Sequence, residues 1–381
     1  MRVLYLTDNL SENGTVRILR DWILMGKEKN LLASLVIRPS SRLGPWLRDH
    51  EIPYTFNRLP LPDLCRPLPS LWSVAKLAAW CRYRKVSIIH CNEHNTYPFG
   101  VLLRKVTGLP LVCHVRYRMS REYCEWAFGG PERQPDALLW TSQQQQRDNA
   151  DSVQGLVPLS KQHLVYIGLS LDTFGSRSSE RQTVRQSWSV GDDDIVIGQA
   201  SVIQPRKRIE DFVALIAKLA SVDSRVLGLL AGDAIAGDEL YRDQVLRMIS
   251  ACGLGNRFRV LGNIKDVEQF YHGIDLYVST SEYETFGNSV CEAMSCSRMV
   301  VAYEGGSVRE ILGNSGIVVA NSDLIALTQV VGDAIRNPCL RQYFGTLGRQ
   351  RVLEVFNPRQ SLDQLLTIYD RLGTPESHGQ S

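Results

Sequence analysis

Several patterns that define well-known protein classes are absent from this 381-residue chain. Its nine cysteines include no Cys-x-x-Cys pair, so the sequence indicates neither a disulfide framework nor a zinc ribbon and favours a reducing cytoplasm. No uncharged apolar run approaches membrane-spanning length. Residues 1–7 are typical of a first strand rather than of a signal peptide. The sequence therefore indicates a globular protein, and its length is sufficient for two domains with buried cores.

Charge is unevenly divided along the chain. The formal net charge is only +3, yet residues 1–135 carry 20 Lys and Arg against 11 Asp and Glu, and the remaining residues carry 23 against 29. Like charges on one domain repel each other and attract a partner of opposite sign. The first part of the chain is therefore expected to meet an anionic partner.

Short apolar strands alternate with helical segments from the amino terminus onward. A strand ending near Thr7 is followed by a turn with the single Gly14 and then by a helix to about Met25. One glycine does not make the dinucleotide fingerprint G-x-G-x-x-G, which argues against a cofactor-binding Rossmann enzyme. The alternation itself predicts a doubly wound parallel sheet, in which ligands meet the carboxyl ends of the strands.

Prolines interrupt this alternation between residues 59 and 69. They predict an irregular surface segment there, since proline opposes regular structure. Residues 71–85 then form an expected amphipathic helix with Trp72, Trp80 and a basic end. A helix of that kind suits a membrane interface. Packing on the sheet with a solvated tail is the favoured interpretation.

Two segments have the composition of metal sites but the wrong setting. His90, Cys91, Glu93 and His94 end a predicted strand, where adjacent side chains point in opposite directions and cannot easily share one ion. Residues 192–194 are three aspartates, but they precede a strand and so lie opposite the expected ligand edge. No metal site is therefore predicted.

The predicted strand at residues 111–116 ends in side chains suited to an anion. His114 and Arg116 have the same parity and share a face, and Arg118 follows. So many cationic groups at a strand exit would repel one another without a partner. An acceptor phosphate or lipid headgroup is favoured, although for His114 a hydrogen-bonded place in the core is an equal alternative.

One stretch organises the rest of the sequence. Residues 274–279 are expected to form a buried strand, 282–287 a turn and 288–297 a helix. Gly287 allows close backbone approach, and the first amides of a helix have no partners within it. The turn is therefore suited to an anion, most simply a phosphate.

Two carboxylates border that turn. Glu284 lies in the turn and Glu292 about one turn into the helix, so both can line one cleft without touching. Carboxylates only accept hydrogen bonds and cannot bind phosphate, but they suit sugar hydroxyls. A sugar nucleotide contains both a phosphate for the turn and sugar hydroxyls for the two carboxylates. The alternative is that both glutamates are solvated surface charges, and the whole motif argues against it.

The segment from Glu284 to Met294 resembles the E-G-F-G-x-x-x-x-E-A-M signature of the retaining glycosyltransferases of family 4, with Thr285 in place of the first glycine. The resemblance covers most of the chain and is strongest over residues 161–310. It implies an α/β protein of the GT-B fold, with two doubly wound Rossmann-like domains facing across a cleft. The expected parts are an acceptor-side domain at 1–172, a nucleotide-sugar-binding domain at 173–360, and a helix and tail at 361–381 that cross back to the first domain.

The resemblance also implies roles for donor-side residues. Glu284 would contact the transferred sugar and Glu292 the ribose, while the amides of the turn would meet the diphosphate. Lys207 matches the lysine of the family's G-R-x-x-x-x-K-G segment, whereas Val202 stands where the arginine is expected. Either Arg206 or Arg208 would take that arginine's place. The expected donor-binding residues are Arg206, Lys207, Asn263, Ile264, Glu284, Thr285, Phe286, Gly287, Asn288 and Glu292.

Further positions follow from the same resemblance. Residues 305–310 resemble the family's G-G-x-x-E, a second turn at a helix start, with one more residue between the glycine pair and Glu310. The expected catalytic residues are Glu284, Lys207, His114 and Arg116, and the expected acceptor-side residues are Asn13, Gly14, Arg116 and Arg118.

The predicted reaction moves a hexose-like group from a nucleoside diphosphate sugar to a hydroxyl with retention of configuration. Cell-surface polysaccharide, lipopolysaccharide or glycolipid synthesis is the expected setting, with no metal and no cofactor. The expected partners are the nucleotide sugar, an anionic or lipid-linked acceptor and the inner face of the membrane, but no nucleic acid. Because Val202, Thr285 and Ile167 depart from the family pattern, a non-catalytic sugar-nucleotide-binding protein is one alternative. A GT-B sugar-nucleotide epimerase is the other.

Overall fold

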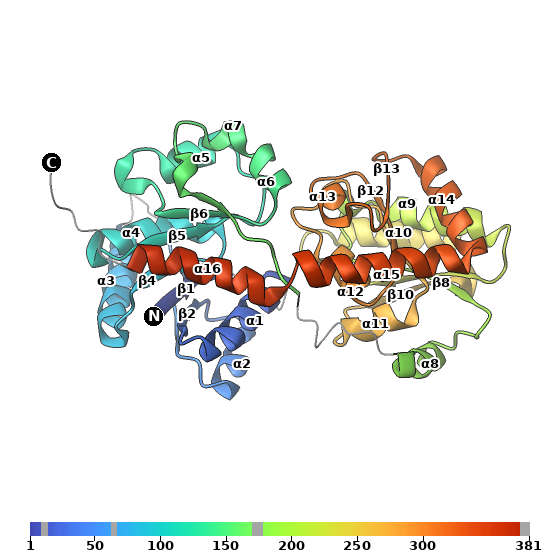
Figure 1. Cartoon of the computed structure of the whole chain (residues 1–381), viewed down its shortest axis with the longest axis horizontal. Coiled ribbons are helices and arrows are strands. Elements are labelled where there is room, and N and C mark those ends of the chain that lie inside the picture. The colour runs from blue at the N-terminus through green and yellow to red at the C-terminus, as the bar shows by residue number, and fades with distance from the viewer. Residues whose placement is uncertain (9–13, 62–66, 170–177, 374–381) are drawn as a thin grey trace. The chain divides into compact units, whose positions relative to one another are not determined.

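The computed structural model describes residues 1–8, 14–61, 67–169 and 178–373. The chain divides into two compact units (Figure 1). Unit 1 comprises residues 1–168 and 358–381, and unit 2 comprises residues 169–357. These divisions lie a few residues before the expected ones. The last helix, α16 (Pro358–Gly373), belongs to unit 1.

Unit 1 is built on a parallel sheet. In its described residues seven strands pair in the order β3-β2-β1-β4-β5-β6-β7. Strands β1, β4, β5 and β6 are buried almost throughout, which is typical of a sheet covered on both faces. The strands are β1 (Arg2–Leu6), β2 (Leu32–Ile37), β3 (Tyr54–Phe56), β4 (Ile88–Cys91), β5 (Leu111–His114), β6 (Ala137–Trp140) and β7 (Gln162–Leu164).

Helices connect these strands and complete the core of unit 1. α1 packs against α16, and α3 packs against α4. The helices are α1 (Gly14–Glu28), α2 (Leu43–Asp49), α3 (Pro67–Arg84), η1 (His94–Thr96), α4 (Tyr97–Thr107), α5 (Arg121–Phe128), η2 (Pro131–Arg133), α6 (Gln143–Asp148), α7 (Ala150–Val153) and η3 (Leu159–Lys161).

The proline-rich segment differs in part from the expectation. α3 begins at Pro67 and includes Pro69 in its first turn, where the sequence analysis expected irregular structure. Proline is tolerated in the first helical turn because the amides there have no intrahelical acceptor to lose. The helix is therefore one turn longer at its start than predicted.

Unit 2 contains a second parallel sheet. In its described residues six strands pair in the order β10-β9-β8-β11-β12-β13. The strands are β8 (Ile195–Ala200), β9 (Val226–Ala231), β10 (Phe258–Gly262), β11 (Leu276–Ser279), β12 (Met299–Tyr303) and β13 (Ile317–Val319). The helices are α8 (Ser178–Ser187), η4 (Pro205–Lys207), α9 (Ile209–Ala220), α10 (Glu239–Ala251), η5 (Gly255–Arg257), α11 (Val267–Gly273), α12 (Asn288–Ser295), α13 (Val308–Leu312), α14 (Leu324–Arg336) and α15 (Pro338–Val355).

Both sheets are doubly wound, as the sequence predicted. In unit 1 the order reverses between β1 and β4, and in unit 2 it reverses between β8 and β11. Ligands of such sheets bind beyond the carboxyl ends of the strands at the point of reversal. The fold therefore directs attention to the residues that follow these four strands.

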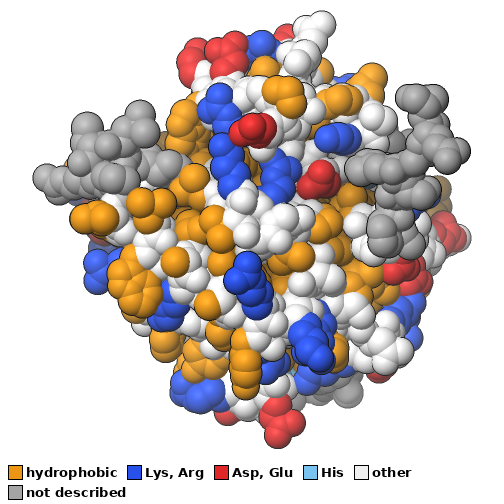
Figure 2. Space-filling view, turned by 90° about the vertical axis from the view of Figure 1, so that its left-hand side faces the viewer, with side chains coloured by type: hydrophobic (Ala, Val, Ile, Leu, Met, Phe, Trp, Pro, Cys, Tyr) orange, Lys and Arg blue, Asp and Glu red, His pale blue; other side chains and the backbone are white. Residues whose placement is uncertain are grey.

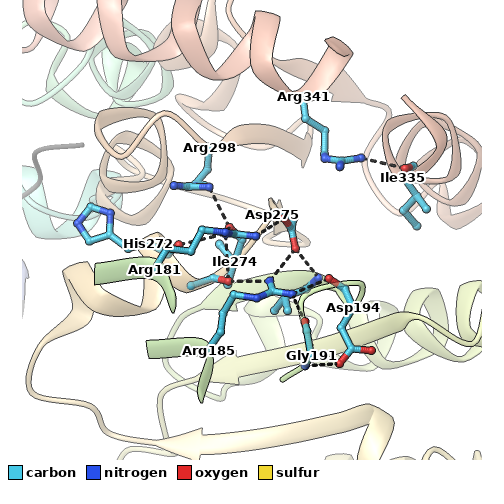
Figure 3. Close-up of polar contacts among 12 residues, drawn as sticks. Arg181, Arg185, Gly191, Asp194, His272, Ile274, Asp275, Arg298, Ile335 and Arg341 are labelled. Atoms are coloured by element: carbon cyan, nitrogen blue, oxygen red, sulfur yellow. Dashed lines mark hydrogen bonds and ion pairs between the residues drawn. The ribbon is translucent and has the colours of Figure 1, made fainter. Parts of the chain in front are cut away.

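An arginine cluster closes the opposite, amino edge of the sheet in unit 2 (Figure 3). Arg181 and Arg185 of α8 both pair with Asp275, at 2.5 and 3.1 Å, just before β11. Arg181 and Arg298 also donate to the carbonyl of Ile274, near the end of α11. Cations at a helix carboxyl terminus are favourable, so the cluster anchors α8 and α11 to the sheet.

Among the described residues, no helix combines the length and the apolar content that crossing a bilayer requires.

Candidate active site

The turn singled out by the sequence lies at the carboxyl edge of the sheet in unit 2. β11 ends at Ser279 and α12 begins at Asn288, close to the predicted boundaries. Gly287 precedes the helix with a φ of 88°. Glycine adopts this left-handed conformation without a side-chain clash. The turn thus presents the start of α12 where the strand order reverses between β8 and β11, a position suited to a phosphate.

A buried ion pair joins the two chain segments that follow β8 and β11. Lys207 of η4 follows β8, Glu284 follows β11, and the Lys207 Nζ donates to the Glu284 Oε1 at 2.5 Å. The two side chains are only 9% and 10% exposed. The Thr280 hydroxyl donates to the carbonyl oxygen of Lys207 at 2.8 Å and holds the η4 turn beside β11. The structure therefore brings together two residues that the sequence assigned to different parts of one donor.

The surroundings of Glu284 favour its ionised form. Burial, the largest single influence, raises the pKa of the carboxyl group, but the charge of Lys207 and hydrogen bonds from Lys207 and Ser281 outweigh it, with a further contribution from Arg206. The net pKa lies below its ordinary value of 4.5. Glu284 is thus a carboxylate at neutral pH and can accept hydrogen bonds from sugar hydroxyls.

Glu292 is the second carboxylate of the motif and is also buried. It lies on α12, and the Tyr271 hydroxyl of α11 donates to its Oε2 at 2.7 Å. Sequence reasoning did not identify Tyr271, because nothing in the motif indicates which residue of the preceding helix faces α12. The bond fixes the orientation of Glu292.

The structure distinguishes the two arginines that could replace the family's missing one. Arg208 has a left-handed φ of 45° and is held by Asp211 at 2.8 Å and Glu282 at 3.3 Å. Arg206 is exposed, donates to the Tyr283 carbonyl at 3.3 Å, and is near enough to Glu284 to lower its pKa. Arg206 is therefore the better placed of the two for a diphosphate.

A second glycine turn packs directly against the first. A Cβ on Gly305 would come within 2.2 Å of the Glu282 carbonyl oxygen, and one on Gly306 within 2.2 Å of that of Glu284. The amide of Ser307 donates to the Glu284 carbonyl at 2.8 Å. The pair Gly305-Gly306 thus supports the backbone of Glu284 in addition to preceding α13, a role that the motif alone did not indicate.

The other donor-side residues occupy mixed environments. Asn263 and Ile264 follow β10, at the same carboxyl edge. The Phe286 ring packs on Phe356 with ring centroids 5.5 Å apart, so only its backbone is available to a ligand. The Oδ1 of Asn288 is buried without a hydrogen-bond partner. Their predicted contacts with a donor stay predictions.

On the acceptor side, His114 lies inside the core of unit 1. It is the last residue of β5, its ring stacks on Trp22 at 5.7 Å, and His90 lies at the same centroid distance. Neither ring nitrogen of His114 has a hydrogen-bond partner, unlike the hydrogen-bonded core histidine that was one expectation. Burial, with Arg116 and His90, lowers its pKa well below 6.5. A catalytic role of this neutral, enclosed ring stays a prediction.

Arg116 lies two residues beyond the end of β5 and is buried. Its Nε donates to the Asn92 carbonyl at 2.9 Å and its Nη2 to the Asn92 Oδ1 at 3.0 Å, while Nη1 is buried without a partner. Burial lowers the pKa of Arg116 to about 10, although Glu93 opposes this. The guanidinium remains charged at neutral pH.

Glu93 is the buried carboxylate that offsets this charge. It accepts from the Thr7 hydroxyl at 3.1 Å, the Asp8 amide at 3.2 Å and the Asn92 amide at 2.6 Å. Burial raises its pKa, and Arg116 and these hydrogen bonds oppose the shift. From the sequence, Glu93 was interpreted only as a candidate metal ligand. Its approach to Arg116 was not predicted, because it depends on β1, β4 and β5 ending side by side.

The remaining residues expected on the acceptor side are Arg118, Gly14 and Asn13. Arg118 and Tyr117 are exposed, and the Tyr117 ring meets His94 edge-on at 6.1 Å. Gly14 begins α1, whereas Asn13 lies outside the described residues.

Over the described ranges, no group of three or more His, Cys, Asp or Glu side chains is arranged to hold a metal ion. The Nδ1 of His94 instead accepts a hydrogen bond from the amide of Arg116 at 3.4 Å.

Comparisons with known proteins show which families this chain resembles. Residues 180–351 match the family described as "Glycosyl transferases group 1". The chain is 26% identical over 318 residues to the lipopolysaccharide core biosynthesis mannosyltransferase LpcC of Rhizobium leguminosarum bv. viciae, covering 82% of this chain and 86% of that one. It is 26% identical over 306 residues to the D-inositol 3-phosphate glycosyltransferase of Mycobacterium ulcerans, covering 74% and 64%.

Solved structures share the fold. Anabaena Alr3699/HepE in complex with UDP and glucose superposes with a TM-score of 0.85 at 21% identity, covering 97% of this chain and 99% of that chain. WaaG, a glycosyltransferase involved in lipopolysaccharide biosynthesis, superposes with a TM-score of 0.70 at 13% identity, covering 95% and 99%.

Two doubly wound sheets, with predicted site residues after the strands where each order reverses, give this chain the GT-B fold that these structures share. Within that fold the chain is similar to the group 1 glycosyltransferases over residues 180–351 and to the mannosyltransferase LpcC over most of its length.

Proposed function

We propose that this chain is a retaining glycosyltransferase that moves a hexose from a nucleoside diphosphate sugar to a hydroxyl of an anionic or lipid-linked acceptor. The observation that supports this most directly is the buried Lys207–Glu284 pair beside the start of α12. A relative named as a lipopolysaccharide core mannosyltransferase and a structural neighbour solved with UDP and glucose favour the same class of reaction. Cell-surface polysaccharide, lipopolysaccharide or glycolipid synthesis is the proposed setting.

On the donor side, the proposal assigns groups to the diphosphate, the transferred sugar and the ribose of a nucleotide sugar. Lys207, Arg206 and the amides that begin α12 would stabilise charge that develops on the diphosphate as the sugar leaves. A lysine contact to phosphate contributes on the order of 1.5–3 kcal/mol. Once Lys207 binds phosphate, Glu284 is free to accept from sugar hydroxyls, while Glu292 accepts from the ribose.

The proposed chemistry needs no side-chain nucleophile. The leaving phosphate would take the proton of the acceptor hydroxyl on the face from which the sugar departs, which preserves the anomeric configuration. Because Lys207 and the α12 amides supply the positive charge, no metal ion is required in this scheme. Transfer should therefore persist in EDTA.

On the acceptor side, the cationic carboxyl edge of unit 1 supports an anionic substrate. Arg116 is held rigidly by Asn92, and Arg118 is exposed beside Tyr117. A charged, aromatic-flanked surface suits a sugar or lipid that carries phosphate or carboxylate. The proposal places the enzyme in the cytoplasm, in peripheral contact with the inner face of the membrane through unit 1.

The first experiment is a thermal-shift panel of UDP- and GDP-sugars, followed by transfer with the stabilising donor. The anomeric configuration of the product is read by proton NMR. Stabilisation by one sugar nucleotide and retention of its configuration are expected. An inverted product would contradict the proposed mechanism.

The two alternatives predict different outcomes in the same assay. A non-catalytic binding protein would be stabilised by a donor but would neither transfer nor slowly hydrolyse it. An epimerase would interconvert the donor sugar without an acceptor and without a change of mass. Transfer that disappears in Glu284→Ala while nucleotide binding persists would exclude both.

A further inference from the structure

α3 of unit 1 is covered on one side only. Val74, Leu77 and Cys81 are buried in the core of unit 1, and the helix packs against α4. A helix that is apolar around its whole circumference normally has both sides buried. Packing on the sheet, which was the interpretation favoured from the sequence, therefore does not explain the apolar residues on the outer side of α3.

The outer side of α3 carries large apolar side chains at helical spacing. Leu68 is 77% exposed, Leu71 59%, Trp72 67% and Tyr83 79%. Scattered single apolar residues are ordinary on protein surfaces, whereas several on one helix face indicate a contact. We call these four residues the outer face of α3.

Charge restricts what can cover the outer face. From Pro67 to Lys85 the sequence has no Asp or Glu but includes Lys76, Arg82 and Arg84. Lys76 and Arg82 are exposed among the apolar residues. Figure 2 shows the side of the molecule on which Figure 1 places α3. Hydrophobic side chains and Lys or Arg side chains are interspersed on that side. An anionic apolar surface complements this combination.

A cationic cavity opens beside the basic end of α3. It measures about 210 Å³ and combines apolar walls with Arg2, Lys27 and Arg84, against one carboxylate, Glu51. Arg2 Nη1 donates to the Arg84 carbonyl at 2.8 Å, and Lys27 Nζ donates to the His50 carbonyl at 2.7 Å. These bonds hold the cationic groups around a space that suits a phosphate attached to an apolar chain.

We propose that the outer face of α3 docks unit 1 on an anionic phospholipid bilayer and that the cavity receives a lipid phosphate. Trp72 and the leucines would enter the headgroup boundary, while Lys76 and Arg82 would extend to the lipid phosphates. This inference deepens the membrane-contact part of the proposed function. It does not depend on the donor or on the chemistry.

The test is co-sedimentation of the full chain with vesicles, without donor or acceptor. Phosphatidylcholine vesicles with phosphatidylglycerol are compared with phosphatidylcholine alone. Binding to the anionic vesicles, weakened by salt, is expected, because basic side chains near anionic lipid are screened by ions. The double variant Leu71→Ser with Trp72→Ser should lower partitioning by about tenfold or more, since two apolar side chains no longer enter the boundary.

Matched variants separate docking from folding. Val222→Ser with Ile325→Ser removes two similarly exposed apolar residues from unit 2 and should leave partitioning unchanged. Urea unfolding should show equal stability for both double variants, because all four side chains are exposed. Arg2→Gln with Lys27→Gln should weaken binding to anionic vesicles only.

Two results would overturn the proposal. One is equal partitioning of the wild type and the α3 double variant. The other is a wild-type dimer in light scattering that ignores vesicles and becomes monomeric in that variant, which would make the outer face an interface between copies. Because no turnover is measured, loss of vesicle binding leaves the proposed transfer reaction intact, and failure of transfer leaves the docking result intact.

Discussion

Lys207 and Glu284 hold one another at 2.5 Å in the interior of unit 2, one following β8 and the other β11. The proposed function assigns them to different parts of a donor, the lysine to the diphosphate and the glutamate to the sugar. Each side chain thus has its counter-charge before a donor arrives. Donor binding would exchange one charged partner for another, which limits the desolvation cost of keeping both groups buried.

This pair makes a prediction about stability and pH. In Glu284→Gln the Lys207 ammonium remains buried without its partner, so the free energy of unfolding at pH 7 should fall by on the order of 3 kcal/mol. The folded pKa of Glu284 is lowered, so its contribution is present above 4.5 and is lost as pH falls through the folded value. The difference between variant and wild type should therefore shrink below pH 4.5. Urea unfolding across this range measures it.

The matched control is Glu282→Gln. Glu282 lies two residues away, is about half exposed and pairs with Arg208. Its loss should change stability by less than about 1 kcal/mol at any pH, since exposed ion pairs contribute little. Equal effects of the two variants would contradict the assigned importance of the buried pair.

Arg206 and Arg208 should respond differently to replacement. In Arg206→Met the donor KM should rise about tenfold or more, because a charge-assisted phosphate contact is lost. In Arg208→Met the KM should hardly change, while stability falls, since this side chain bonds Asp211 and Glu282 instead. Steady-state kinetics and urea unfolding of both variants decide this. A larger KM effect in Arg208→Met would reverse the assignment.

Tyr271 should position Glu292 for the donor ribose. Tyr271→Phe removes the 2.7 Å hydrogen bond and should raise the donor KM about fivefold with little change in kcat, since one ordinary hydrogen bond contributes about 1 kcal/mol. Tyr303→Phe is the control, because that hydroxyl bonds Asp211 instead. A fall in kcat alone would argue against a role in donor binding.

The enclosed histidines of unit 1 predict acid sensitivity. Burial lowers the pKa of His90 to about 3 and that of His114 well below 6.5. Below pH 6.5 the unfolded chain takes up protons that the folded chain does not, so each residue removes up to about 1.4 kcal/mol of stability per pH unit. His114→Phe should unfold with a weaker pH dependence between pH 6.5 and 5. An unchanged slope would show that His114 is protonated in the folded state.

Much of the donor side could be predicted from local sequence. Gly287 was expected to allow close backbone approach just before a helix, which is a strictly local requirement, and it does precede α12. Lys207 was expected from its match to the lysine of the family's G-R-x-x-x-x-K-G segment. The bond between Lys207 and Glu284 was not, because it joins chain segments that meet only when β8 and β11 pair.

The acceptor side shows the opposite balance. His114 and Arg116 share a parity, yet one lies among aromatic rings and the other is hydrogen-bonded to Asn92, with the charge of Glu93 nearby. The parity of two residue numbers indicates that their side chains share a face of the strand, but not the depth to which each side chain is buried. That depth depends on α1, which contributes Trp22 from a distant part of the sequence.

The sequence alone determined the alternation of strands and helices, the glycine turns and the chemical types of the site residues, since each depends on neighbours a few positions away. Only the tertiary structure decided which charges neutralise one another and which apolar faces remain uncovered, because burial and pairing depend on segments that the parallel sheets bring together. The outer face of α3 illustrates this, since the helix carries apolar residues on two sides and packing buries only one of them.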